Sequence, residues 1–138
     1  MAGERILVVE DNEKNMKLFR DVLQATGYRT LEATAGAHAV ALALEHRPDL
    51  VLMDIRLPDF DGVEALSRLR ADARTSTIPV LAVTAQAMYG DDERFLAAGF
   101  AGYVSKPVNV VDFLAAVRRH CDAQRQSASR GDNSEART

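Results

Sequence analysis

Residues 50–62 read LVLMDIRLPDFDG, and this stretch decides how the chain is expected to fold. The apolar run Leu50–Met53 predicts a buried central strand, and Asp54 stands directly after it. The loop that follows contains Pro58 and ends at Gly62, which is typical of a turn. A short apolar strand that ends at a polar group fits the carboxyl edge of an open α/β sheet, where such sheets bind ligands.

Three further apolar runs end in the same way. Each is followed within two residues by a polar group: Ile6–Val9 by Glu10 and Asp11, Val80–Val83 by Thr84, and Tyr103–Val104 by Lys106. If these runs are neighbouring parallel strands, the polar side chains emerge at one edge of one sheet together with Asp54.

Segments of helical period separate the strands, which is typical of βα units and a parallel sheet. Arg29–Thr34 alternates polar and apolar residues, as an edge strand does. Asn12 and Asn109 are good helix N-caps, and Gly27 and Gly99 suit helix ends. The predicted helices carry apolar residues at helical spacing: Met16, Phe19 and Leu23; Ala37, Val40 and Leu44; Val63, Leu66 and Leu69; and Val110, Phe113, Leu114 and Val117. Five βα units fill residues 4–121, so we expect one α/β domain there.

The composition limits which classes of protein this chain can belong to. With 138 residues, 47% of them hydrophobic, the chain is expected to form a globular core. A net charge of −3 and a pI of about 5.6 argue against a nucleic-acid-binding surface. Cys121 is the only cysteine, so we expect no disulfide and a reducing, cytoplasmic location, with neither a leader nor a membrane segment. Residues 122–138 are polar, and we expect them to be a disordered tail.

The chemistry of the predicted edge favours a phosphoryl group and a divalent cation. Two carboxylates about 4 Å apart repel by roughly 4 kcal/mol at an effective dielectric of 20, so three of them call for protonation or a cation. Carboxylates without imidazole or thiolate suit Mg²⁺ or Mn²⁺. Asp54 is the predicted nucleophile and Thr84 the hydroxyl donor. Lys106 is a mobile cation that can pair with Asp54 when the site is empty and with a phosphoryl oxygen when it is filled. Ala85 leaves room for a phosphoryl group beside Thr84.

Four motifs carry a resemblance to a known family: ILVVEDN at 6–12, LVLMDIRLPDFDG at 50–62, IPVLAVTA at 78–85 and GYVSKP at 102–107. The chain resembles the receiver domains of two-component response regulators, from residue 5 to about residue 120. The segment EDNEKNMKLFRDVLQATGY is most similar to stand-alone receivers of DivK type. Glu10 stands where an aspartate is more common in the family.

The resemblance implies a flavodoxin-like (βα)5 fold with a doubly wound sheet of order 2-1-3-4-5. It implies that Asp54 is the phosphoacceptor, and that Glu10, Asp11, Asp54 and the backbone carbonyl of Arg56 hold the metal. It further implies that Thr84, Ala85 and Lys106 bind the phosphoryl group, that Thr84 and Tyr103 form a switch, and that Lys106–Pro107 is a cis peptide.

We therefore expect a receiver that accepts a phosphoryl group from a histidine kinase or a histidine phosphotransfer protein and turns over no separate substrate. Its signal would leave through contact with a downstream protein, and the chain would be a monomer or a weak phosphorylation-dependent dimer. Candidate docking residues, for which core packing is the competing interpretation, are Met16, Leu18, Phe19, Val108 and Val110.

Three other functions stay open at this stage. The chain could be a receiver-like interaction module that acts without phosphorylation. A phosphatase resembling the haloacid dehalogenases would carry a second aspartate two residues after the nucleophile, where this chain has Arg56. A flavin-binding protein on a similar sheet would need a hydroxyl- and glycine-rich loop after the first strand, which the sequence EDN does not supply.

Overall fold

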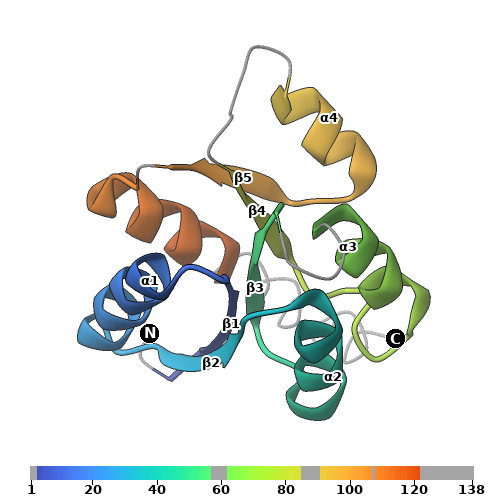
Figure 1. The fold of residues 1–138 in the computed structure, drawn as a ribbon, viewed down its shortest axis with the longest axis horizontal. Coiled ribbons are helices and arrows are strands. Elements are labelled where there is room, and N and C mark those ends of the chain that lie inside the picture. Colours follow the sequence, from blue (N-terminus) through green and yellow to red (C-terminus); the bar gives the residue numbers. More distant parts are fainter. Residues whose placement is uncertain (1–2, 57–61, 85–90, 107, 122–138) are drawn as a thin grey trace, which may run out of the picture.

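The computed structural model describes residues 3–56, 62–84, 91–106 and 108–121. Five parallel strands form one sheet in the order β2-β1-β3-β4-β5, which confirms the predicted doubly wound topology (Figure 1). The strands are β1 Arg5–Val9, β2 Arg29–Ala33, β3 Leu50–Asp54, β4 Val80–Thr84 and β5 Gly102–Ser105.

Helices alternate with the strands: α1 Glu13–Ala25, α2 Gly36–His46, α3 Gly62–Ala71, α4 Asp91–Ala98 and a last helix over residues 110–121. The side chain of Asn12 caps α1 by accepting from the Asn15 N–H at 3.0 Å. Asn109 caps the last helix in the same way. Gly27, with φ 102°, follows the end of α1, where a left-handed backbone needs a residue without a Cβ.

Helices cover both faces of the sheet and create two cores (Figure 1). On one face α1 and the last helix pack together, and the rings of Phe19 and Phe113 stack with centroids 5.2 Å apart. On the other face α2, α3 and α4 pack against alternate residues of the central strands. Strands β3 and β4 are buried along their whole length, which explains their unbroken apolar runs.

Three of the apolar residues that indicated helices lie outside the core. Ala37 is exposed, and Val63 and Val110 are each 41% exposed. In α2 the buried positions are Gly36, Ala39 and Ala43. That helix is apolar nearly all round, so hydrophobicity alone does not set its orientation. Helix α3 buries Gly62, Ala65, Leu66 and Leu69, a pattern of helical spacing that leaves Val63 outside it.

The sheet extends further at its carboxyl edge than the apolar runs predicted. Asp54 and Thr84 are the last residues of β3 and β4 rather than the first residues of loops. Hydrogen bonds continue past the other strands, from the Glu10 N–H to the Ala33 carbonyl at 3.0 Å and from the Lys106 N–H to the Thr84 carbonyl at 2.8 Å. Regular backbone therefore fixes the direction of each of these side chains.

Several sequence-based expectations lie outside the described residues. They concern the turn over residues 57–61, Ala85 beside Thr84, the Lys106–Pro107 peptide and the tail at 122–138. Within the described ranges, none of the helices has the length and apolar character that crossing a bilayer requires.

Gly62 packs against the backbone that carries Asp54. A Cβ placed on Gly62 would lie 2.7 Å from the Asp54 carbonyl oxygen and 3.1 Å from the Ile55 Cα. These neighbours are main-chain atoms at the end of a buried strand, so they cannot move aside without moving Asp54 itself. Glycine at this position lets α3 begin directly against β3.

We therefore expect Gly62→Ala to lower the free energy of unfolding by about 1–3 kcal/mol, because the added methyl group overpacks fixed backbone. Gly102→Ala is the matched control, since its Cβ would meet a side-chain atom, Leu81 Cδ2, at the longer distance of 3.3 Å and should cost less than about 1 kcal/mol. Urea unfolding of the wild type and both variants measures this difference. Equal costs for the two substitutions would contradict the close approach at Gly62.

Candidate functional site

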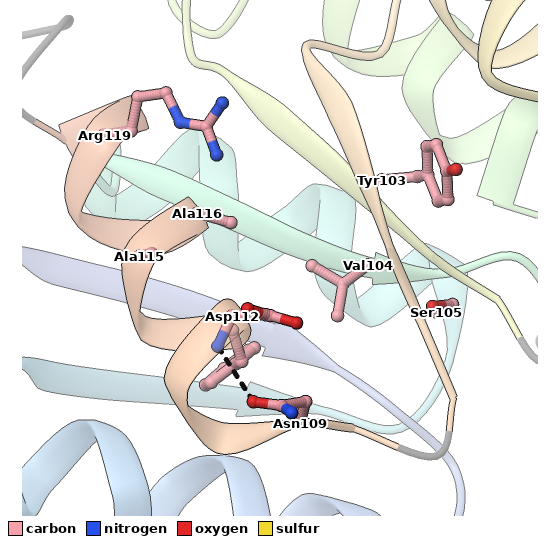
Figure 2. A pocket seen from close by; sticks show the side chains of 9 residues that line it. Tyr103, Val104, Ser105, Asn109, Asp112, Ala115, Ala116 and Arg119 are labelled. Carbon is pink, nitrogen blue, oxygen red and sulfur yellow. Dashed lines mark hydrogen bonds between the residues drawn. The ribbon is translucent and has the colours of Figure 1, made fainter.

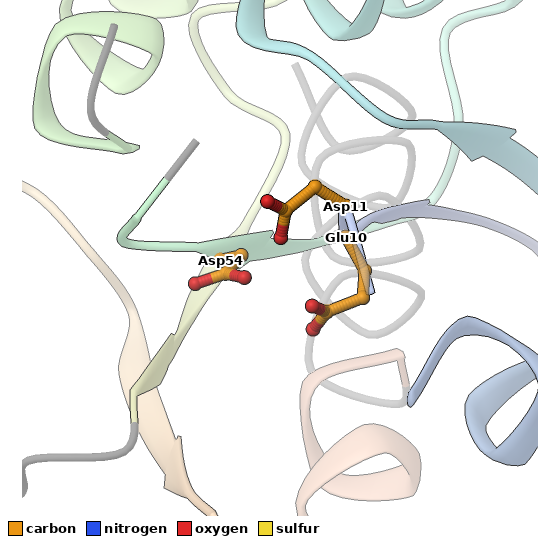
Figure 3. A group of neighbouring side chains, drawn as sticks. All are labelled: Glu10, Asp11 and Asp54. Atoms are coloured by element: carbon orange, nitrogen blue, oxygen red, sulfur yellow. The ribbon is translucent and has the colours of Figure 1, made fainter. Parts of the chain in front are cut away.

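Three carboxylates meet at the carboxyl edge of the sheet (Figure 3). Glu10 and Asp11 lie in the loop between β1 and α1, and Asp54 ends β3. One oxygen from each lies within 4.8 Å of the others. Glu10 is 1% exposed and Asp54 is 5% exposed, whereas Asp11 faces solvent. The predicted convergence of these residues is therefore present.

Lys106 lies between two of the carboxylates. Its Nζ is 2.9 Å from Glu10 Oε1 and 3.3 Å from Asp54 Oδ2, to which it donates a hydrogen bond. The pairing with Asp54 was expected from the sequence, and the shorter contact with Glu10 was not. One ammonium thus balances part of the charge of two buried carboxylates.

Backbone amides hold the second oxygen of each carboxylate. The Arg56 N–H donates to Asp54 Oδ1 at 2.9 Å, and the Asn12 N–H donates to Glu10 Oε2 at 3.2 Å. Each acid is therefore fixed by a main-chain donor two residues further along the chain. This arrangement orients both carboxylates toward the same space without a further side chain.

Burial and charge shift the pKa values of the ion pair. Burial raises the pKa of Glu10, with a further rise from the Asp54 charge, and Lys106 opposes this only in part. Burial by itself would lower the pKa of Lys106, but the Glu10 and Asp54 carboxylates outweigh it and raise that pKa. The Lys106 side chain is therefore protonated at neutral pH.

The same residues line a cleft that opens at the sheet edge. Its walls come from the loop after β1, the ends of β3 and β4 and the residue after β5: Glu10, Asp11, Asn12, Asn15, Asp54, Ile55, Arg56, Thr84 and Lys106. Thr84 is 7% exposed and ends β4 at this cleft. Asn15, on the first turn of α1, is a lining residue that the sequence analysis missed, because helical spacing gave it no distinct signal.

The donor set fits a hard divalent cation. Carboxylate oxygens without imidazole or thiolate are the ligands that Mg²⁺ prefers. Glu10 Oε1 is buried and, among the described residues, accepts no well-aligned hydrogen bond, although Lys106 lies beside it. A buried carboxylate oxygen in that state has capacity for a further positive partner.

Tyr103 lies outside the cleft. Its side chain is 39% exposed, and its ring centroid is 5.8 Å from that of Phe95 in α4. Figure 2 shows Tyr103 on the opposite side of β5 from Val104, which faces the last helix. A second hollow lies between β5 and that helix, with the Asp112 N–H bonded to Asn109 Oδ1 at 3.1 Å.

Of the five candidate docking residues, two are in the core. Met16 is 6% exposed and Phe19 is 1% exposed, and both lie on the buried face of α1. These two side chains therefore serve core packing, the competing interpretation, and are not accessible to a partner. Val108 is partly buried against the same cluster, whereas Leu18 and Val110 are 37% and 41% exposed.

Comparison with known proteins decides the family. The model for the response regulator receiver domain matches residues 6–118 of this chain. The chain belongs to this family. It is 49% identical over 115 residues to the polar-differentiation response regulator DivK of Brucella anthropi, and 48% identical to that of Brucella abortus. These matches cover 83% of this chain and 94% of each relative. The chain is thus a receiver domain of DivK type, a component of two-component signalling.

Solved structures agree with this assignment. The receiver domain of a sensor histidine kinase from Pseudomonas aeruginosa, with a magnesium ion coordinated in its active site cleft, is 37% identical with a TM-score of 0.80. That match covers 88% of this chain and 99% of the other. A CheY-like receiver domain protein from Methanospirillum hungatei is 28% identical with a TM-score of 0.81, over 91% of this chain and 99% of the other.

The crowding of carboxylates predicts a stability effect. Asp11 is exposed and stands beside two buried acids, so in the presence of a chelator we expect Asp11→Asn to raise the free energy of unfolding by about 1 kcal/mol. Asp21→Asn is the control, because Asp21 pairs with Lys17 on α1 and should gain nothing. Urea unfolding measures both variants. A loss of stability in Asp11→Asn would show that these acids do not repel.

Proposed function

We propose that this receiver accepts a phosphoryl group on Asp54 from the phosphohistidine of a histidine kinase or a histidine phosphotransfer protein. The observation that carries the proposal is the position of Asp54, at the end of a buried strand with Lys106 Nζ 3.3 Å from its Oδ2. A carboxylate oxygen of Asp54 forms the new bond to phosphorus as the histidine nitrogen–phosphorus bond breaks. The electron pair of that bond returns to the imidazole.

The residues of the cleft have separate roles in this proposal. Asp54 needs no general base, because a carboxylate is ionised at neutral pH. The Arg56 N–H orients Asp54 through Oδ1. Lys106 turns from the carboxylates to an oxygen of the phosphoryl group, and the Thr84 hydroxyl donates to another. The sequence assigns a further role to Ala85, which lies outside the described residues: as the small residue after Thr84 it would leave room for the group.

A divalent cation, Mg²⁺ or Mn²⁺, is part of the proposal. Glu10, Asp11, Asp54 and the backbone carbonyl of Arg56 would hold it, directly or through water. When bound, the cation neutralises the carboxylates and adds positive charge beside the phosphoryl oxygens. Support comes from the three converging carboxylates and from the related receiver that carries magnesium in its cleft.

Phosphorylation would be read out as a change of surface. We assign Thr84 and Tyr103 to this switch, because Thr84 lines the cleft and Tyr103 lies on the neighbouring strand against Phe95 of α4. The phosphoryl group favours one of two packings of these side chains.

A protein partner then binds the altered surface, and the exposed Leu18 and Val110 are candidate contacts for the proteins on either side of the relay. The receiver modifies itself and turns over no separate substrate.

The competing function is an interaction module that binds its partner without phosphorylation. It would need the fold and the exposed surface but neither Asp54 nor a cation. The paired Lys106 and the main-chain donor on Asp54 favour the phosphorylated switch, because both groups orient the acid toward an open cleft.

Intact-protein mass after exposure to a small acyl-phosphate donor tests the proposal. In Mg²⁺ we expect one phosphoryl adduct on the wild type and none on Asp54→Asn, which keeps the shape but loses the nucleophile. Asp112→Asn, in the last helix and outside the cleft, is the matched control and should keep the adduct. No adduct on the wild type in Mg²⁺ or Mn²⁺ would favour the interaction module.

A further inference from the structure

The ion pair of Lys106 with Glu10 is shorter than its contact with the proposed phosphoacceptor. The Nζ–Oε1 distance is 2.9 Å and the Nζ–Oδ2 distance to Asp54 is 3.3 Å. Glu10 is almost fully buried and the Lys106 side chain is 18% exposed, so water screens their attraction poorly. Lys106 is therefore closer to the carboxylate of Glu10, which follows β1, than to that of Asp54, which ends β3.

The length of the Glu10 side chain makes this contact possible. An aspartate at position 10 would withdraw the carboxylate by about one carbon–carbon bond, roughly 1.5 Å. With Lys106 in its present position, a shift of that size away from Nζ would take the 2.9 Å contact beyond ion-pair range. The extra methylene of Glu10 thus determines which partner holds Lys106.

Glu10 is nevertheless not locked onto the lysine. Its Oε2 is held by the Asn12 N–H, while Oε1 lies beside Lys106 without a well-aligned hydrogen bond. One oxygen of the Glu10 carboxylate also lies within 4.8 Å of an oxygen of Asp11 and of Asp54. The Glu10 carboxylate is therefore within reach of two positive partners, the Lys106 ammonium and a cation held by the three acids.

We propose that Glu10 is a positioning residue that holds Lys106 in the metal-free protein and releases it when the Glu10 carboxylate turns to the cation. This inference rests on the proposed metal site. Lys106 and the cation compete for one buried carboxylate, so each weakens the binding of the other to Glu10. Once released from Glu10, Lys106 stays paired with Asp54 until it turns to an oxygen of the phosphoryl group.

The proposal separates two effects of Lys106 on Mg²⁺ affinity. Removing the lysine removes a nearby positive charge, which strengthens cation binding whatever residue stands at position 10. It also frees the Glu10 carboxylate, and this second gain requires both the charge and the length of Glu10. A double-mutant cycle isolates the second effect.

The test is the Mg²⁺ dissociation constant of the unphosphorylated protein by titration calorimetry. It is measured for the wild type, Lys106→Met, Glu10→Asp and the double variant. We expect Lys106→Met to tighten Mg²⁺ binding at least about threefold more in the wild type than in the Glu10→Asp background. Equal tightening in the two backgrounds would overturn the role of Glu10.

Two controls keep the result interpretable. Glu10→Gln keeps the length of the side chain without its charge, so Lys106→Met should tighten Mg²⁺ binding by the same reduced amount in this background. It replaces Glu10→Asp in the cycle if that variant does not fold. Lys17→Met removes a lysine of α1 that pairs with Asp21, and its effect should be small and equal in both backgrounds.

The outcome is distinct from that of the phosphorylation experiment. Phosphorylation of Asp54 together with equal tightening in the cycle would reject only the role of Glu10. The expected cycle without any phosphoryl adduct would support Glu10 and reject the proposed transfer. Failure of every folded variant to bind Mg²⁺ would reject the metal site and the inference with it.

Discussion

The whole site depends on one ammonium among buried carboxylates. Glu10 and Asp54 are both nearly inaccessible to water, and Asp11 adds a third negative charge beside them. Such a group of acids would separate or take up protons without positive charge nearby. Lys106 supplies that charge from the residue after β5, at 2.9 Å and 3.3 Å from the two buried acids. This balance is partial, which leaves the cleft suited to a further cation.

The parallel sheet places these groups together. Asp54 and Thr84 end adjacent strands, and the strand ladder continues through the amides of Glu10 and Lys106. Helices on both faces bury β3 and β4, so the strand ends cannot shift independently of the core. The close packing of Gly62 on the Asp54 carbonyl adds a second constraint on the same residue. The core thus sets the geometry of the cleft.

Sequence alone predicted the strands, their order by resemblance, and the convergence of Glu10, Asp11, Asp54, Thr84 and Lys106, because these depend on backbone periodicity and topology. It did not predict that Lys106 lies closer to Glu10, since that depends on side-chain rotamers and one methylene. It also did not show that Ala37 is exposed, because an alanine-rich helix has no strong apolar stripe. Residues such as Met16 and Phe19 have the same spacing whether they serve as core or as a docking surface, and only burial separates the two.

The central claim is that one cleft at the carboxyl edge binds the phosphoryl group and that β4, β5 and α4 respond. Two-dimensional NMR of the protein with Mg²⁺, before and after addition of the acyl-phosphate mimic beryllofluoride, tests it most directly. We expect shifts at Glu10, Asp54, Thr84 and Lys106, with further shifts at Tyr103, while the opposite edge near Arg5 and Ile78 stays unchanged. Shifts confined to that opposite edge, or no shifts at all, would contradict it.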